Sequence, residues 1–328
     1  MRMISLGAFF SAWKDPKVCA ELIRSLRLKD RLFLARLLIN VLPHRIAGST
    51  KVLLESAQLF RQRQEFGLAK ATLMRALPRL KGKVRQSVKR SLRQLSALER
   101  VNVKVLASAQ DHRITLYSQR AGSGVVVVTF GTISSSLNTE PFGFPFLIEQ
   151  GYDHIHVAQS KYTLYQSLSL EEFQKIVAVH CKGKKVVSYG SSLGGYAALY
   201  FGGCLDAKII AASPVNFVDK VILVKRWALV PMRHSLISEN PTSSKAPVIF
   251  YDPLDDERDR VYLAKRVLPA YPNAKVIPIP GGGHATFNEL QKRGILKSTI
   301  LSIVEGNFDA RKLLLELNEQ DEQKAQVA

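Results

Sequence analysis

Cysteine is scarce in this chain of 328 residues, which contains only Cys19, Cys181 and Cys204. Three scattered thiols exclude a disulfide framework, and no C-x-x-C pair points to a metal site. Unpaired thiols are typical of proteins that work in a reducing cytoplasm. We therefore expect a cytoplasmic protein that binds no metal.

Long apolar runs are also missing. No apolar segment reaches the roughly 18 residues that a membrane-spanning helix requires. Residues 1–13 include one arginine and a short apolar stretch, but no A-x-A cleavage site follows, so we expect no secretory signal. The protein should be soluble or attached to the inner face of a membrane.

Acidic residues are rare in the first third of the chain. Residues 1–100 contain 22 lysines and arginines but six aspartates and glutamates, a net charge of +16, whereas residues 101–328 carry only +4. A region of this charge should attract polyanions. Aromatic residues are sparse among the basic ones and no nucleic-acid-binding motif is present, so nucleic acid is not an expected partner.

Apolar residues in residues 1–100 follow a helical period. Val88, Leu92, Leu95 and Leu98 recur at steps of four and three, and the neighbouring lysines and arginines fall off that stripe. The pattern predicts basic helical hairpins without a clean 34-residue repeat. Such helices favour an anionic membrane surface or an acidic partner protein, although a solvated positive face is an alternative.

From Val101 onward, strand and helix patterns alternate, which predicts an α/β fold with a doubly wound, mostly parallel sheet over residues 101–316. The polar residues 317–328 should form a frayed tail. The expected strands are Val101–Leu106, Arg113–Tyr117, Gly124–Phe130, His154–Ala158, Lys185–Tyr189, Lys208–Ala212, Val248–Tyr251 and Lys275–Ile279. The expected helices are Phe144–Gln150, Leu170–His180, Gly195–Phe201, Arg258–Leu268 and a last one from Phe287.

One segment, residues 215–245, fits neither the strand nor the helix pattern well. It lies between two expected strands and contains Trp227 and Pro231. It is interpreted equally well as a cap over the sheet or as a crossover helix with extended flanks.

Gly190-Ser191-Ser192-Leu193-Gly194 reads G-x-S-x-G and lies between an apolar strand and a helix. This strand–turn–helix context is what a nucleophile elbow requires, with Ser192 as the nucleophile. The glycines are needed because side chains at the flanking positions would collide across the sharp turn. The alternative is a glycine-rich turn in another α/β fold.

A serine nucleophile needs a base and a third group that orients the base. His284 follows three glycines after the last expected strand, which makes it the expected base. For the acid, several carboxylates follow the strand Val248–Tyr251. Asp255 is the first choice and Asp256 the next, while Asp259 is an alternative acid that would serve equally as a helix N-cap.

The reaction also needs donors for a developing oxyanion. The backbone N–H of Leu193, directly after the nucleophile, should be one. The other should come from the loop after strand Gly124–Phe130, where Thr132 is the natural position.

At the G-x-S-x-G stretch, the Asp255 region and the Gly283-His284 loop, the chain resembles the α/β-hydrolase superfamily of serine esterases and lipases, over residues 101–310. The resemblance implies an eight-stranded sheet and a Ser-His-Asp triad of Ser192, His284 and Asp255. The usual His-Gly of the oxyanion loop is Phe130-Gly131 here.

Two stretches, 190–196 and 251–253, also resemble hydrolase-like proteins of bacterial surface-polysaccharide and accessory secretion systems. That resemblance strengthens Asp259 as the acid and implies a glycan acyl group as the substrate.

The leading hypothesis is a serine hydrolase that cleaves a carboxylic ester or related acyl bond through an acyl-enzyme, without a cofactor. The alternative is a non-catalytic or acyltransferase-like protein of envelope-polysaccharide or secretion machinery. The triad alone does not separate an esterase from a thioesterase, peptidase or acyltransferase, and it does not identify the substrate.

Overall fold

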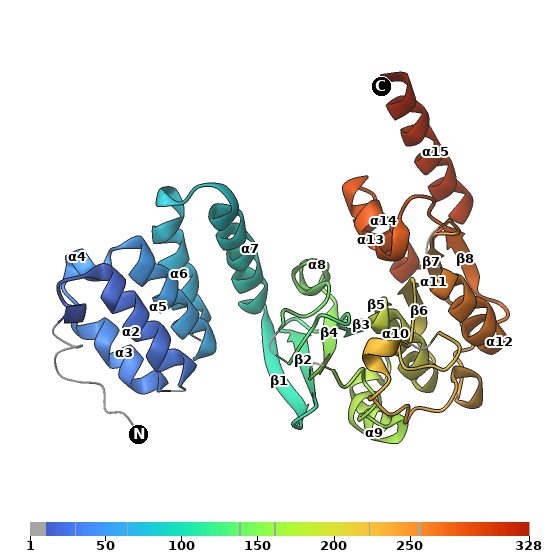
Figure 1. Cartoon of the computed structure of the whole chain (residues 1–328), viewed down its shortest axis with the longest axis horizontal. Helices are drawn as coiled ribbons and strands as arrows, with labels where there is room; N and C mark the ends of the chain where they lie inside the picture. Colours follow the sequence, from blue (N-terminus) through green and yellow to red (C-terminus); the bar gives the residue numbers. More distant parts are fainter. Residues whose placement is uncertain are drawn as a thin grey trace. The chain divides into compact units, whose positions relative to one another are not determined.

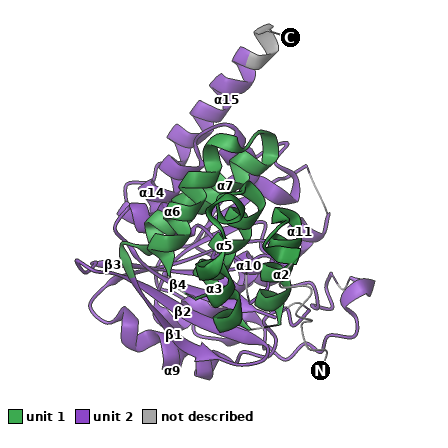
Figure 2. Ribbon diagram, turned by 90° about the vertical axis from the view of Figure 1, so that its left-hand side faces the viewer, with its two compact units in different colours: residues 1–101 green, residues 102–328 purple. Residues whose placement is uncertain are grey.

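The computed structural model describes residues 11–29, 31–63, 65–137, 139–160, 162–222, 224–254 and 257–327 (Figure 1). Asp255 and Asp256 lie outside the described residues. The chain divides into two compact units, Met1–Val101 and Asn102–Ala328 (Figure 2).

The first unit is built from helices. They are α2 (Pro16–Leu28), α3 (Leu32–Val41), α4 (His44–Ala47), α5 (Thr50–Gln62), α6 (Phe66–Ala76), a 3-10 turn (Leu77–Arg79) and α7 (Gly82–Leu98). Two of them begin at side-chain caps: the Asp15 carboxylate accepts from the Lys17 N–H at 2.7 Å, and the Ser49 hydroxyl accepts from the Val52 N–H at 3.4 Å.

Apolar stripes hold these helices together. Ile23 of α2 packs in one cluster with Leu38 of α3, and Leu73 of α6 packs in a second cluster with Leu95 of α7. Each stripe recurs at helical spacing, so burial selects one face of each helix.

The second unit is built on one eight-stranded sheet in the order β1-β2-β4-β3-β5-β6-β7-β8. Strand β2 pairs antiparallel with β4, and the pairs from β4 through β3 to β8 are parallel. The strands are β1 (Val101–Ser108), β2 (His112–Gln119), β3 (Val125–Phe130), β4 (Asp153–Gln159), β5 (Lys185–Ser191), β6 (Lys208–Ala212), β7 (Val248–Tyr251) and β8 (Lys275–Pro278). The predicted doubly wound, mostly parallel sheet is confirmed.

Helices cover both faces of this sheet. On one face, Val126 and Val128 of β3 pack in a core with α9 (Leu170–Cys181), α10 (Leu193–Gly202) and α11 (Glu257–Tyr262). On the other, Val127 packs in a core with the helices α8 (Phe144–Glu149), α13 (Thr286–Lys292), α14 (Leu296–Glu305) and α15 (Ala310–Val327). Burial on both faces explains why β3 reads as a continuous apolar run.

The end of the chain differs from the prediction of one helix followed by a frayed tail. Three helices, α13, α14 and α15, follow β8, and they are separated at Gly294 (φ 78°) and Gly306 (φ 94°). A left-handed glycine is a common helix terminator. Leu317 is 5% exposed and packs in the core on that face of the sheet, so the helix continues where the sequence is polar.

The predicted helix Arg258–Leu268 is also more complex. It consists of α11, a π-helical segment (Leu263–Val267) and a short α12 (Leu268–Ala270). Pro269 lies in α12. Proline has no N–H and clashes with the preceding turn, so a widened turn before it is physically reasonable.

Two histidines are buried within the sheet. His154 and His156 of β4 lie 2.6 and 2.9 Å from the Thr129 hydroxyl of β3, and neither is more than 4% exposed. Burial lowers the pKa of His154 and lowers that of His156 from 6.5 to about 4. Both therefore stay neutral in the folded protein at neutral pH.

This burial predicts acid sensitivity. In the unfolded chain His156 binds a proton below pH 6.5, but in the folded chain only below about pH 4, so stability falls as the pH drops through this window. We expect His156 alone to lower the free energy of unfolding by about 2 kcal/mol as the pH falls from 7 to 5. Urea unfolding of His156→Gln should show a shallower loss over that range, whereas the exposed His44→Gln should follow the wild type. Equal slopes for wild type and His156→Gln would contradict the prediction.

Within the described residues, no helix has the length and apolar character needed to cross a membrane.

Candidate active site

Ser192 lies at the turn between β5 and α10, as the G-x-S-x-G pattern predicts. Its backbone has φ 57° and ψ −123°, which is rare for a residue with a side chain and costs of order 1–3 kcal/mol. Hydrogen bonds hold the strained turn, because the Ser192 N–H donates to the Ala212 carbonyl at 2.8 Å and its carbonyl accepts from the Tyr196 N–H at 3.0 Å. The hydroxyl is therefore presented at a fixed point.

The flanking glycines are required for close approach. A Cβ on Gly190 would lie 2.1 Å from the Gly194 carbonyl oxygen, and a Cβ on Gly194 would lie 2.6 Å from the Phe130 carbonyl oxygen. Both contacts are with backbone, which cannot move aside cheaply. The predicted reason for these glycines, collision across the turn, is confirmed.

His284 lies on a tight glycine loop after β8. Gly281 and Gly283 have φ of 74° and 57°, which only glycine adopts without strain. The Asp252 carboxylate, 4% exposed at the end of β7, accepts from the Gly283 N–H at 2.9 Å. Asp252 thus fixes the loop that carries the histidine, and no pattern in the sequence distinguished it from the other carboxylates nearby.

The structure brings a serine, a histidine and an aspartate into one chain of contacts. His284 Nε2 lies 2.7 Å from Ser192 Oγ, and His284 Nδ1 lies 2.7 Å from Asp259 Oδ2. A carboxylate only accepts hydrogen bonds, so Nδ1 carries the proton and Nε2 accepts from the serine hydroxyl. The order in the chain is Ser, Asp, His, as in α/β-hydrolases.

Among the described residues, the carboxylate in contact with His284 is that of Asp259, which the sequence ranked as an alternative, while the first choice, Asp255, lies outside the described residues. Asp259 lies in the first turn of α11 and is 5% exposed. Nothing is described of Asp255 and Asp256.

The structure describes both residues that were expected to supply oxyanion donors. Leu193 is the first residue of α10, where a backbone N–H has no partner within its own helix. Thr132 follows β3, and its carbonyl accepts from the N–H and the hydroxyl of Ser135 at 3.0 and 2.7 Å. The loop is therefore anchored, while donation by the Thr132 N–H stays a prediction.

A cavity of about 490 Å³ opens onto Ser192 and His284. The sequence did not identify its other lining residues, which come from the loops after β3 and β4 and from the segment between β6 and β7: Ile133, Ser134, Tyr162, Phe217, Val224, Arg226 and Trp227. Among the described residues, no three histidines, cysteines or acids are grouped as metal ligands.

The segment between β6 and β7 contributes Phe217, Val224, Arg226 and Trp227 to the lining of this cavity. The described part of the segment contains two 3-10 turns, Lys225–Trp227 and Ile237–Glu239, and no α-helix. His234 fixes the segment to the body of the unit: its Nδ1 lies 2.7 Å from the Tyr196 hydroxyl and its Nε2 lies 2.9 Å from the Leu168 carbonyl. The described residues of the segment therefore form no crossover helix, and a cap over the sheet stays a prediction.

A buried ion pair also holds the segment. Arg266 donates two hydrogen bonds to Asp219, at 2.8 and 3.0 Å, and the Asp219 side chain is 2% exposed. Hydrogen bonding to Asp219 raises the pKa of Arg266. The pair joins the segment between β6 and β7 to the π-helical segment after α11.

Removing the cation of the Arg266–Asp219 pair should destabilise the fold, because it leaves a buried carboxylate without its cation. We expect Arg266→Met to lower the free energy of unfolding by about 3 kcal/mol, measured by urea denaturation. Lys265→Met, at the exposed neighbouring position, should change it by less than about 0.5 kcal/mol. Similar losses in both variants would contradict a specific role for the pair.

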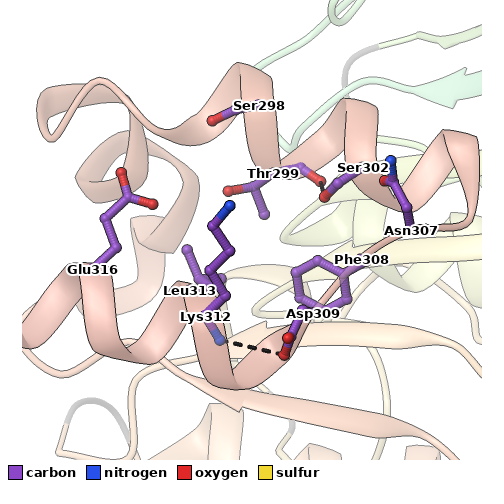
Figure 3. A pocket seen from close by; sticks show the side chains of 9 residues that line it. All are labelled: Ser298, Thr299, Ser302, Asn307, Phe308, Asp309, Lys312, Leu313 and Glu316. Atoms are coloured by element: carbon purple, nitrogen blue, oxygen red, sulfur yellow. Dashed lines mark hydrogen bonds between the residues drawn. The ribbon is translucent and has the colours of Figure 1, made fainter.

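A second cavity, of about 240 Å³, lies between α14 and α15 (Figure 3). Its serine and threonine hydroxyls are engaged by their own helix: Ser298 and Thr299 both donate to the Ile295 carbonyl, at 2.9 and 2.8 Å. Asp309 accepts from backbone N–H groups of α15, including that of Lys312 at 3.3 Å. These groups serve helix structure, so the cavity at Ser192 is the candidate active site.

No protein-family model matches the chain, and no curated protein sequence matches it. Solved structures resemble it at low identity. Esterase 2 of Thermogutta terrifontis, phosphonylated by cyclosarin, is 16% identical, with a TM-score of 0.46 over 64% of this chain and 96% of the esterase. The capsule O-acetyltransferase of Neisseria meningitidis serogroup A is 16% identical, with a TM-score of 0.41 over 60% and 93%. XC6422 of Xanthomonas campestris, an α/β serine hydrolase without a lid, is 13% identical, with a TM-score of 0.41 over 64% and 96%.

Proposed function

We propose that the chain is a serine hydrolase that cleaves a carboxylic ester, or a related acyl bond, through an acyl-enzyme on Ser192. The observation that carries the proposal is the pair of 2.7 Å contacts that join Ser192 to His284 and His284 to Asp259 beside a cavity. Each contact is within the reach that proton transfer requires.

In the acylation step, the Ser192 hydroxyl oxygen attacks the acyl carbon while His284 Nε2 takes the hydroxyl proton. Asp259 holds the imidazole in the required tautomer and stabilises the imidazolium that forms. The N–H groups of Leu193 and Thr132 stabilise the oxyanion. His284 then protonates the leaving oxygen, the bond to the leaving group breaks, and the acyl-enzyme remains.

In the deacylation step, His284 takes a proton from a water molecule as the water attacks the acyl carbon. The tetrahedral intermediate collapses, His284 returns the proton to Ser192, and the acid is released. A hydroxyl of a glycan in place of water would make the same site an acyltransferase, so the first step is common to both activities.

The non-catalytic alternative requires no activated serine. The strained backbone at Ser192 and the bonded histidine favour catalysis, because strain of this kind persists where a site needs it. As the substrate class we propose a small-molecule or glycan acyl ester.

Labelling with a fluorophosphonate probe tests the proposal. Wild-type protein should become covalently labelled, and both Ser192→Ala and His284→Ala should not. Ser191→Ala is the matched control, because it removes the neighbouring hydroxyl of the same motif and should leave labelling intact. Folded wild-type protein that is never labelled, or label that remains in Ser192→Ala, would overturn the proposal.

A further inference from the structure

The candidate active-site cavity contains a cation. Among the described residues that line it, Arg226 is the one lysine, arginine, aspartate or glutamate. In the described part of the chain, its guanidinium makes no ion pair and lies over the Trp227 ring, with its Cζ 4.8 Å from the ring centroid. The charge is therefore held by an aromatic ring and not neutralised by an acid.

Aromatic rings form the wall beside this cation. Trp227 is 6% exposed, and the Tyr162 ring lies 5.6 Å from it, centroid to centroid. A guanidinium on such a wall keeps its donors for a ligand, and its planar fork matches the oxygens of a carboxylate or a phosphate. A purely apolar acyl chain would gain nothing from this charge.

We propose that Arg226 is a specificity residue and that the natural substrate is an ester bearing a carboxylate or phosphate group near the scissile bond. This inference rests on the proposed hydrolase function. Since Ser192 and the exposed Arg226 line one cavity, a substrate whose acyl carbon lies at Ser192 places its anionic group beside Arg226. The anion is on the acyl side or on the alcohol side of the ester.

Matched ester pairs test this. Mono-4-nitrophenyl glutarate against 4-nitrophenyl pentanoate probes an acyl-side carboxylate. 3-Acetoxybenzoate against its methyl ester, and 3-acetoxyphenyl phosphate against 3-acetoxyanisole, probe an alcohol-side carboxylate and phosphate. In at least one pair we expect kcat/KM to favour the anionic member by about 10-fold, mainly through KM. Arg226→Gln should abolish that preference.

Lys225→Gln is the control, because it removes the same charge at the adjacent exposed position outside the cavity lining and should keep the preference. Hydrolysis of every pair without an anionic preference, or a preference that survives in Arg226→Gln, would overturn this inference and leave the hydrolase proposal standing. Failure of both hydrolysis and fluorophosphonate labelling would instead overturn the hydrolase proposal.

A separate observation concerns α3 of the first unit, which exposes several of its apolar side chains. Its sequence, LFLARLLINV, buries Ala35 and Leu38, yet Phe33 is 72% exposed and Leu37 is 48% exposed. Several large apolar side chains exposed on one helix indicate an interaction surface. We define the outer face of α3 as its exposed apolar residues Phe33, Leu34, Leu37 and Val41.

The unit that carries this face is strongly basic. Helix α3 has no acidic residue, and residues 1–100 as a whole carry +16. Leu28, the last residue of α2, is also 68% exposed, and Lys29, Asp30 and Arg31 follow it in the sequence. Exposed apolar side chains on a basic unit suit the interface of an anionic bilayer, because the apolar side chains insert among the lipid tails and the cations attract the anionic headgroups.

We infer that the outer face of α3 binds the surface of an anionic lipid bilayer. Full-length protein should sediment with vesicles of phosphatidylcholine and phosphatidylglycerol (3:1) and not with phosphatidylcholine alone. The double variant Phe33→Asp/Leu37→Asp should bind at least 10-fold more weakly. Leu229→Asp, at a 98% exposed leucine of the second unit, is the control and should bind as wild type does.

The inference is overturned if wild type ignores anionic vesicles, or if the double variant binds as well as wild type. Gel filtration tests self-association as the alternative. If the wild type is a dimer, the double variant is a monomer and neither binds vesicles, the outer face of α3 is a dimer interface.

Discussion

Replacing Ser192 by alanine should lower the turnover of an ester substrate by about 10⁶-fold. The variant loses the atom that forms the acyl-enzyme, and only stabilisation of the oxyanion and substrate binding remain. The histidine and aspartate cannot compensate, because they act through the serine hydroxyl, 2.7 Å from His284 Nε2. Steady-state kinetics of the wild type and the variant on the same ester measure the effect.

Ser191→Ala is again the matched control and should retain turnover within a few-fold. The variant at residue 192 should keep the thermal stability of the wild type, since alanine and serine meet the same backbone strain at φ 57°. Equal loss in both serine variants, or turnover that survives in Ser192→Ala, would contradict the assignment of the nucleophile.

Replacing Asp259 by asparagine should lower kcat by about 10⁴-fold with little change in KM. The amide keeps the shape of the side chain but can present an N–H to His284 Nδ1, which then favours the tautomer that cannot accept the serine proton. Asp259 is buried and 2.7 Å from Nδ1, so water is poorly placed to replace it. The pH dependence of kcat and KM, measured separately, distinguishes this effect from loss of substrate binding.

Asp255→Asn and Asp256→Asn are the controls, because both residues lie close to Asp259 in the sequence and Asp255 was the first choice there. We expect each to lower kcat by less than 10-fold. If Asp255→Asn lowered kcat by about 10⁴-fold while Asp259→Asn stayed nearly active, Asp255 would be the acid of the triad.

The elements that local patterns specify were predicted well. Apolar runs such as 125–130 identify buried strands, and their alternation with helices predicts the α/β class, whereas the order of the strands in the sheet was not predicted. Ser192 and His284 were singled out because glycines beside each residue indicate a constraint on the backbone, and the structure brings the two side chains into contact.

The same reasoning could not identify which of the neighbouring carboxylates contacts His284. Several carboxylates follow β7 within a few residues, and each is compatible with a loop or a helix N-terminus. Which of them faces His284 depends on where α11 begins and how it packs, and the Tyr262 ring of α11 lies 6.4 Å from the Tyr196 ring of α10. That contact joins residues far apart in the sequence.

By itself, the sequence determined the class of the fold and singled out the serine and the histidine as candidates, because the signals for these are local: alternation, apolar runs, and glycines where the backbone needs φ > 0 or a close approach. Only the tertiary structure decided the contact of Asp259 with His284 and the placement of Arg226 in the cavity. Both features depend on packing between segments that are distant in the sequence, and the spacing of residues along the chain does not predict such packing.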